Sequence, residues 1–184
     1  MGYFAVIDTE TNWADQIMSI GTVIADTDTF EKADMRYHIL PIECGIGGMY
    51  ADALFIDTPV PPICCTRAEA IGDLTRCFDS YGVEMIFAYN ACFDRNHLPE
   101  LYNYQWFDIM RLAAYRQYNP KIPSTAEFCA TGRLKRGYGV EAMLRLLSGN
   151  QTYRESHNAI FDALEELQIM KLLGHPISHY ISLR

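Results

Sequence analysis

Two acidic residues, Asp8 and Glu10, follow an apolar run at the start of the chain, which reads M-G-Y-F-A-V-I-D-T-E-T. In a β-strand successive side chains point to opposite faces, so residues two apart lie on the same side. Two carboxylates held this close need either solvation in a turn after Ile7 or a cation between them. Hard divalent cations prefer carboxylate oxygens. The spacing alone leaves both alternatives open.

Further acidic residues recur at the ends of later apolar runs. The run V-E-M-I-F-A-Y leads into Asn90 and then Asp94, and a helical pattern begins S-H-N-A-I-F-D-A, with His157 and Asp162. Taken alone, the first pair fits turn and cap residues, and the histidine fits a helix-start residue bonded to the backbone. An acid on an apolar helix face, as Asp162 is, requires a partner charge or a metal. Together the four acids, Asp8, Glu10, Asp94 and Asp162, predict a site for two divalent cations, with His157 as general base.

The size and composition of the chain predict a single domain that spans residues 1–184. With 49% hydrophobic residues, the chain can bury a substantial core. The sequence has no run of about 18 apolar residues to cross a membrane and no secretion signal at its start. Its six cysteines include no C-x-x-C pair, which favours free thiols over structural zinc. We therefore expect a cytoplasmic protein without membrane association.

The charge is unevenly distributed along the chain. The formal net charge of -8 taken alone argues against a nucleic-acid binder. Residues 111–154, however, carry eight basic residues and only two acidic ones. Such a basic stripe beside a cleft that holds cations would suit a phosphate backbone, although an ordinary solvated surface explains it equally well. If the stripe binds substrate, we expect the contacts from Arg133, Lys135 and Arg136.

Hydrophobic periodicity predicts an α/β layer with a mixed sheet. The first three strands are joined by short connections, so they should be antiparallel neighbours, whereas the strand after the first helix should return parallel. Thr66 and Glu69 form a capping-box pattern at the start of that helix. We expect strands over residues 3–8, 18–25, 35–40, 83–89 and 106–109, helices over 66–81, 140–147 and 158–173, a helix from the last strand to about 118, and loops over 41–62 and 119–139.

In three motifs the sequence resembles the DEDDh exonucleases, also called DnaQ-like 3′-to-5′ exonucleases. The family's D-x-E after a strand is matched by F-A-V-I-D-T-E-T, its N-x-x-x-D by A-Y-N-A-C-F-D, and its H-N-A-x-x-D-A by H-N-A-I-F-D-A, all in the family's order. The resemblance covers nearly the whole chain except residues 41–62 and 119–139. It implies an α/β, ribonuclease H-like fold with a central mixed five-stranded sheet flanked by helices.

The resemblance also implies a role for each motif residue. Asp8, Glu10 and Asp162 would ligate one Mg²⁺ or Mn²⁺ ion, while Asp8 and Asp94 would position a second, partly through water. His157 would accept the proton of the attacking water, releasing a nucleoside 5′-monophosphate. All five residues would therefore be catalytic, and two ions would be bound at each active site.

The implied partner is the single-stranded 3′ end of DNA or RNA. We expect Thr11, Trp13 and Asn90 beside the motifs to contact it, with the Trp13 ring stacked on the terminal base unless that ring belongs to the core. The sequence does not decide between DNA and RNA. A polymerase or a second copy of the chain is a further expected partner, and proofreading, DNA repair and RNA trimming all remain open.

Two other functions compete with this interpretation. Paired carboxylates also serve glycoside hydrolysis without metal, but that chemistry leaves Asp162 and His157 unexplained. A non-catalytic nucleic-acid-binding or scaffold subunit would keep the fold, yet such a protein should have lost a ligand, and none is missing.

Overall fold

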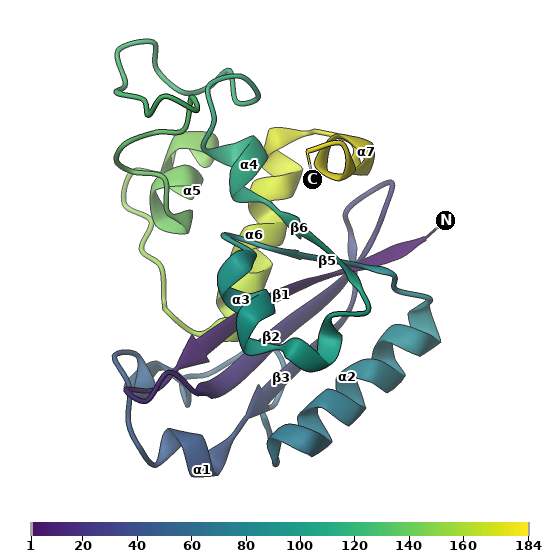
Figure 1. Cartoon of the computed structure of the whole chain (residues 1–184). Helices are drawn as coiled ribbons and strands as arrows, with labels where there is room; N and C mark the ends of the chain where they lie inside the picture. Colours follow the sequence, from purple (N-terminus) through teal and green to yellow (C-terminus); the bar gives the residue numbers. More distant parts are fainter. Residues whose placement is uncertain (1, 184) are drawn as a thin grey trace.

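The computed structural model describes residues 2–183 as an α/β fold built around one mixed sheet (Figure 1). Its six strands lie in the order β4-β3-β2-β1-β5-β6. The strands are β1 (Tyr3–Thr11), β2 (Ile17–Asp26), β3 (Lys32–Ile39), β4 (Ile63–Cys64), β5 (Met85–Ala88) and β6 (Gln105–Asp108). The helices are α1 (Pro41–Cys44), η1 (Ala51–Ala53), α2 (Arg67–Tyr81), α3 (Cys92–His97), η2 (Pro99–Leu101), α4 (Met110–Ala113), α5 (Val140–Ser148), α6 (Ala159–Leu173) and α7 (Ile177–Ile181).

The sheet pairs as the sequence predicts. β1, β2 and β3 are antiparallel neighbours, and Asp8 of β1 lies opposite Gly21 of β2. β5 returns parallel to β1 after α2, and β6 adds parallel to β5. Parallel strands end at the same edge of a sheet, so the chain segments that follow β5 and β6 start near the end of β1.

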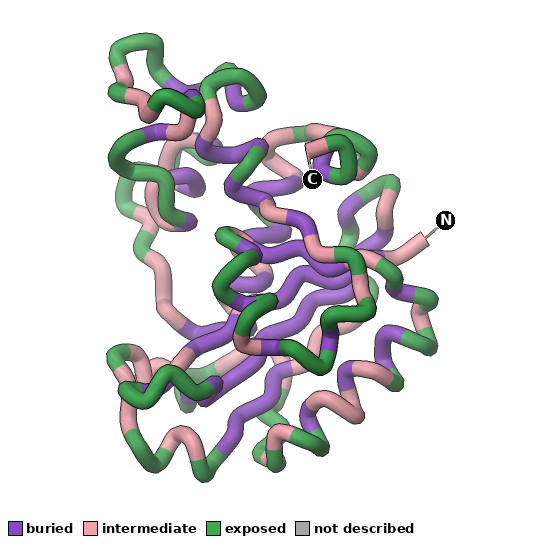
Figure 2. Tube along the Cα trace, in the orientation of Figure 1, coloured by how far each residue is buried: buried purple, intermediate pink, exposed green. Residues whose placement is uncertain are grey.

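Helices cover both faces of the sheet. On one face Val6 belongs to the same apolar cluster as Ile160 of α6, and on the other Ile7 packs in a cluster with Leu74 of α2. Because neighbouring strand residues point to opposite faces, the apolar run of β1 fills both clusters. The central strands are accordingly buried along their length (Figure 2).

The long helices begin and end where the sequence predicts. Thr66 caps α2 in a capping box with Glu69, and α6 ends at Gly174 in the left-handed conformation. All six cysteines are free thiols. Within residues 2–183, every helix is too short or too polar to span a membrane.

Three predictions about the elements are wrong. The sheet has six strands instead of five, because β4 pairs parallel with β3. The sequence did not predict β4, because the prolines of P-V-P-P just before it lack backbone donors and indicate a loop.

The helix expected to reach about residue 118 ends at Ala113. There Asn119 donates to the Ala113 carbonyl, and the Leu134 N–H donates to Ala114, so tertiary partners satisfy carbonyls that a longer helix would use. The expected loop over 41–62 also contains α1 and η1.

A glycine allows α6 to approach the sheet closely. A Cβ atom on Gly21 would lie 2.0 Å from the carbonyl oxygen of Ala159 and 2.4 Å from the backbone nitrogen of Ile160. Since Gly21 lies opposite Asp8, the start of α6 is held directly over the strand that carries the first acids. Any side chain at Gly21 would push the helix away from them.

We predict that Gly21→Ala destabilises the fold by about 3 kcal/mol, because the new methyl group meets backbone atoms that cannot move independently. Gly72→Ala is the matched control: Gly72 lies in the middle of α2, where the new Cβ would meet only the flexible Arg76 side chain, at 3.4 Å. That control should be neutral or stabilising by up to about 1 kcal/mol. Urea denaturation of both variants measures the difference, and equal stabilities would contradict the close approach.

Candidate active site

The first two acids lie within β1 and not in a turn after it. The strand continues through Thr11, so Asp8 and Glu10 share one side of it, and the solvated-turn alternative is wrong. Thr9, between them, holds the next acid. Its backbone N–H and its hydroxyl donate to Oδ1 of Asp94 in α3 at 3.0 and 2.8 Å. The D-T-E sequence therefore presents two carboxylates and fixes a third.

The fourth acid and the histidine come from the start of α6, which packs on the face of β1 that carries Glu10. Ligand atoms of Glu10, His157 and Asp162 all lie within 4.8 Å of one another. Asp162 is only 3% exposed, and its Oδ1 has no hydrogen-bond partner within the described residues. The structure thus brings together the five residues predicted from the sequence.

The electrostatics of this cluster favour a bound cation. Burial raises the pKa of Asp162 to about 9, with further contributions from nearby carboxylates, and it raises the pKa of Glu10 to about 8 and that of Asp94 to about 7. Burial, and then Asp94, also hold the pKa of Asp8 well above its ordinary value. Metal binding would remove this penalty. The all-oxygen carboxylate donors and the orphaned Asp162 oxygen fit Mg²⁺ or Mn²⁺.

Known structures share this fold at low sequence identity. No protein-family model matches the sequence, and no curated protein matches it either. The nuclease domain of 3′hExo bound to rAMP, described as a DEDDh family member, is 14% identical with a TM-score of 0.60, over 95% of this chain and 93% of that one. The fold is that of a DEDDh exonuclease domain.

Two longer proteins with this exonuclease fold also match. A zinc-bound E. coli exonuclease I complex with single-stranded DNA is 14% identical, with a TM-score of 0.58, over 100% of this chain and 42% of that one. A 3′-exonuclease whose structure describes 3′-end-specific recognition of a histone mRNA stem-loop is 13% identical, with a TM-score of 0.61, over 95% of this chain and 64% of that one. The chain therefore spans less than two thirds of each.

His157 lies in the loop just before α6, next to the N-cap Asn158, and its ring stacks on the Tyr50 ring. Its φ of 53° is left-handed, and its ring lies 3.9 Å from the Tyr50 ring at an interplanar angle of 15°. Stacking of this kind orients the imidazole, one nitrogen of which lies near Glu10 and Asp162. The sequence gives no sign of this contact, since Tyr50 lies in a segment without periodicity.

The segment that carries Tyr50 is tied to the start of α6. Asn158 accepts a hydrogen bond from the Ile160 N–H as the N-cap, and its Nδ2 donates to the Ala53 carbonyl at 2.7 Å. The same Nδ2 contacts the Tyr37 hydroxyl, which donates to the Leu54 carbonyl at 2.7 Å. One buried asparagine therefore fixes both the helix that bears Asp162 and the segment that holds Tyr50.

Glu166 is a buried acid that the sequence analysis missed. It lies one helical turn after Asp162 on the same side of α6 and is 1% exposed. Burial, and then Asp94, raise its pKa well above the ordinary value. Glu166 interrupts the apolar face of the helix as Asp162 does, so the sequence carries the same signal at both positions.

A hollow of about 440 Å³ opens beside the acids. Three large apolar side chains on its wall are exposed: Trp13 by 68%, Met49 by 67% and Phe93 by 40%. The alternative that Trp13 belongs to the core is therefore wrong. The hollow is lined by Thr9, Glu10, Thr11, Asn12, Trp13, Asp15, Met49, Tyr50 and Phe93.

The other predicted substrate contacts lie apart from this hollow. Asn90 is exposed at the end of β5 with a left-handed φ of 63°, and its N–H donates to Asp108. The segment with Arg133, Lys135 and Arg136 projects beyond α4 and α5 (Figure 1). Within the described residues, no ion pair joins these basic side chains to the acids.

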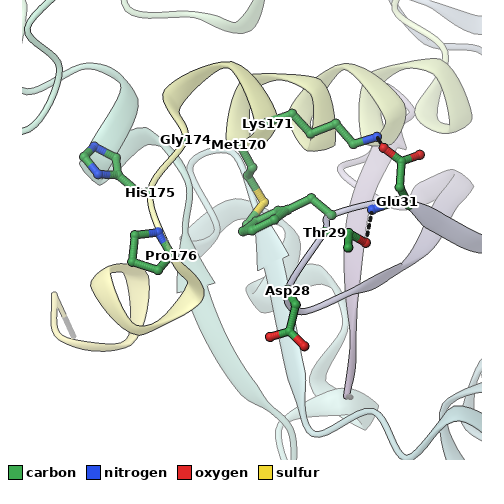
Figure 3. A pocket seen from close by; sticks show the side chains of 9 residues that line it. Asp28, Thr29, Glu31, Met170, Lys171, Gly174, His175 and Pro176 are labelled. Carbon is green, nitrogen blue, oxygen red and sulfur yellow. Dashed lines mark hydrogen bonds and ion pairs between the residues drawn. The ribbon is translucent and has the colours of Figure 1, made fainter.

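A larger hollow, of about 510 Å³, lies at the other end of α6 (Figure 3). The β2–β3 turn lines it from one side, and an ion pair of Glu31 with Lys171, at 2.9 Å, closes part of its rim. Among the described residues that line it, no group of carboxylates lies near enough to share a cation. The acid cluster is therefore the better candidate for an active site than this hollow.

We predict that the metal-free protein loses stability as pH rises. The folded chain keeps protons on Asp94, Glu10 and Asp162 up to pH values of about 7, 8 and 9, whereas the unfolded chain releases them near pH 4. The native state then binds more protons, so the free energy of unfolding falls between about pH 4 and pH 9.

Thermal unfolding in EDTA from pH 5 to pH 9 measures this fall. Saturating Mg²⁺ should raise the melting temperature most at high pH, where the acids are ionised, and Asp162→Asn should flatten the fall in EDTA. A melting temperature that neither pH nor Mg²⁺ changes would contradict the description of the cluster.

Proposed function

We propose that this chain is a metal-dependent 3′-5′ exonuclease of the DEDDh family. The observation that carries the proposal is the convergence of Asp8, Glu10, Asp94, Asp162 and His157 in one cluster whose acids Glu10, Asp94 and Asp162 are buried, within a fold shared with 3′-exonucleases. The enzyme would hydrolyse the terminal phosphodiester bond of DNA or RNA and release a nucleoside 5′-monophosphate.

The acids would hold two divalent ions in the two groups that the sequence implies. Asp8, Glu10 and Asp162 would bind the first, and Asp8 and Asp94 the second. Bound Mg²⁺ or Mn²⁺ would lower the pKa of a water molecule and stabilise the leaving oxygen. Because the acids lie on β1, α3 and α6, they would not need to rearrange when the substrate binds.

His157 would act as the general base. One of its ring nitrogens lies near the carboxylates of Glu10 and Asp162, where the attacking water would lie, and the Tyr50 ring supports the imidazole from one face. A positioned base of this kind contributes about 10²- to 10⁴-fold to the rate.

The hollow beside the cluster would hold the last nucleotides of a single strand. The exposed Trp13, Met49 and Phe93 side chains offer apolar surfaces to nucleobases, and Thr11 offers a polar contact beside them. Stacking reads little sequence, so the enzyme would accept many 3′ ends. Arg133, Lys135 and Arg136 would contact phosphates farther along the strand, and the exposed Asn90 after β5 would be a further contact.

Several biological roles are compatible with this proposed activity. A stand-alone repair or RNA-trimming enzyme and a proofreading subunit beside a polymerase would share this chemistry, as would a dimer of the chain. We propose a cytoplasmic location, because free cysteines suit a reducing compartment.

A gel time course on four 5′-labelled oligonucleotides tests the proposal. The substrates are single-stranded DNA, single-stranded RNA, and a duplex of each with a mismatched 3′ end, in Mg²⁺, Mn²⁺ or EDTA. We expect a ladder that shortens from the 3′ end only with metal, and the fastest substrate would identify the class.

Asp162→Asn should abolish the ladder, because it removes a ligand from the cluster, while Asp79→Asn on the exposed side of α2 should leave it unchanged. Binding without cleavage under every metal would instead favour a non-catalytic subunit.

The histidine and its stacking partner give a second test. His157→Ala should lower kcat by about 10²-fold or more with little change in KM. Tyr50→Leu should lower kcat less, because it removes only the aromatic support, and Tyr50→Phe should restore it since the ring remains. If Tyr50→Phe is as slow as Tyr50→Leu, the hydroxyl and not the stacked ring is what matters.

A further inference from the structure

The acids of the cluster fall into two groups that share Asp8. Glu10, His157 and Asp162 form the tighter group, with ligand atoms within 4.8 Å. On the other side of Asp8, the carboxylates that interact with it most strongly are Asp94 and then Glu166. The second group therefore contains a third carboxylate that the sequence motifs do not include.

Glu166 points into the cluster without a positive partner. Its Oε2 is buried and has no hydrogen-bond partner among residues 2–183, and no ion pair reaches it there. Its carboxylate accepts a hydrogen bond from the Tyr89 N–H. The parallel register pairs Val6 with Phe87, so Tyr89, the first residue after β5, follows in line with Asp8.

The nearby acids give Glu166 no relief from its buried charge. Its carboxylate neighbours are Asp94, Asp162 and Asp108. Of these, Asp108 already accepts hydrogen bonds from the Asn90 and Met110 N–H groups. A buried carboxylate oxygen that faces only other acids is destabilising unless a cation lies among them.

We propose that Glu166 is a fifth carboxylate of the metal centre and that it holds the second cation together with Asp8 and Asp94. This inference rests on the proposed function, since it deepens the assignment of the two-cation site. The ligand atoms of Glu10, His157 and Asp162 all lie within 4.8 Å of one another, whereas the oxygens of Asp8, Asp94 and Glu166 are more widely spaced. Wide spacing suits a cation that keeps part of its water shell, as Mg²⁺ does, with Glu166 contacting a bound water.

The test compares Glu166→Gln with Glu165→Gln. The first variant removes the charge but leaves an oxygen that can accept the Tyr89 N–H bond. The control removes the same charge from the adjacent helix position, where Glu165 lies near Asp162, Tyr153 and Glu155 instead of Asp8 and Asp94. It therefore tests the loss of a negative charge beside the first cation and not beside the second. Circular dichroism and the melting temperature in EDTA establish that both variants are folded.

A titration with Mn²⁺, monitored by calorimetry and by electron paramagnetic resonance, measures metal binding independently of cleavage. We expect two Mn²⁺ ions and a spin-coupled spectrum in the wild type and in Glu165→Gln. In Glu166→Gln one site should keep its Kd and the other should weaken by about tenfold or more, so that the coupled spectrum disappears.

Two outcomes would overturn the inference. Wild-type binding of both ions by Glu166→Gln would remove Glu166 from the centre, and equal weakening in both variants would show only a general loss of negative charge. Failure of the proposed function is distinct: a wild type that binds two ions but degrades no oligonucleotide would contradict the nuclease assignment and leave the role of Glu166 intact.

Discussion

Several carboxylates share a buried space between β1 and α6, where each one raises the free energy needed to ionise the others. Asp8 and Glu10 come from the strand, Asp162 and Glu166 from the helix, and Asp94 from α3. Within the described residues, ion pairs with basic side chains do not neutralise them. The apolar clusters on both faces of the sheet must therefore hold this charge in place, and the cluster gains most from a ligand that brings positive charge.

The fold resists that repulsion through close packing at one end of α6. Gly21 lets the helix backbone approach β2, and Asn158 ties the helix start to η1 and to Tyr37. The acids thus lie on regular elements with fixed backbones, whereas His157 lies at a joint whose backbone is left-handed. This division suits the proposed chemistry, because ligands must stay in place while a base accepts and releases a proton.

Local patterns were enough to predict much of this structure. Alternation and capping residues predicted the strands and α2. Acids at the ends of apolar runs predicted Asp8 and Asp94, and an acid on an apolar helix face predicted Asp162. The roles of Tyr50 and Gly21 were not predictable, since each depends on a contact with a residue distant in the sequence. The same cause explains β4 and the early end of α4, which depend on pairing partners and not on local propensity.

The central claim is that the acid cluster is a two-cation site. Anomalous diffraction from crystals grown with millimolar Mn²⁺ tests it most directly. The account predicts two anomalous peaks about 3.5–4 Å apart, one beside Glu10 and Asp162 and the other beside Asp94, with Asp8 between them. Well-ordered crystals with no peak among these carboxylates, or with Mn²⁺ only at surface acids, would contradict it.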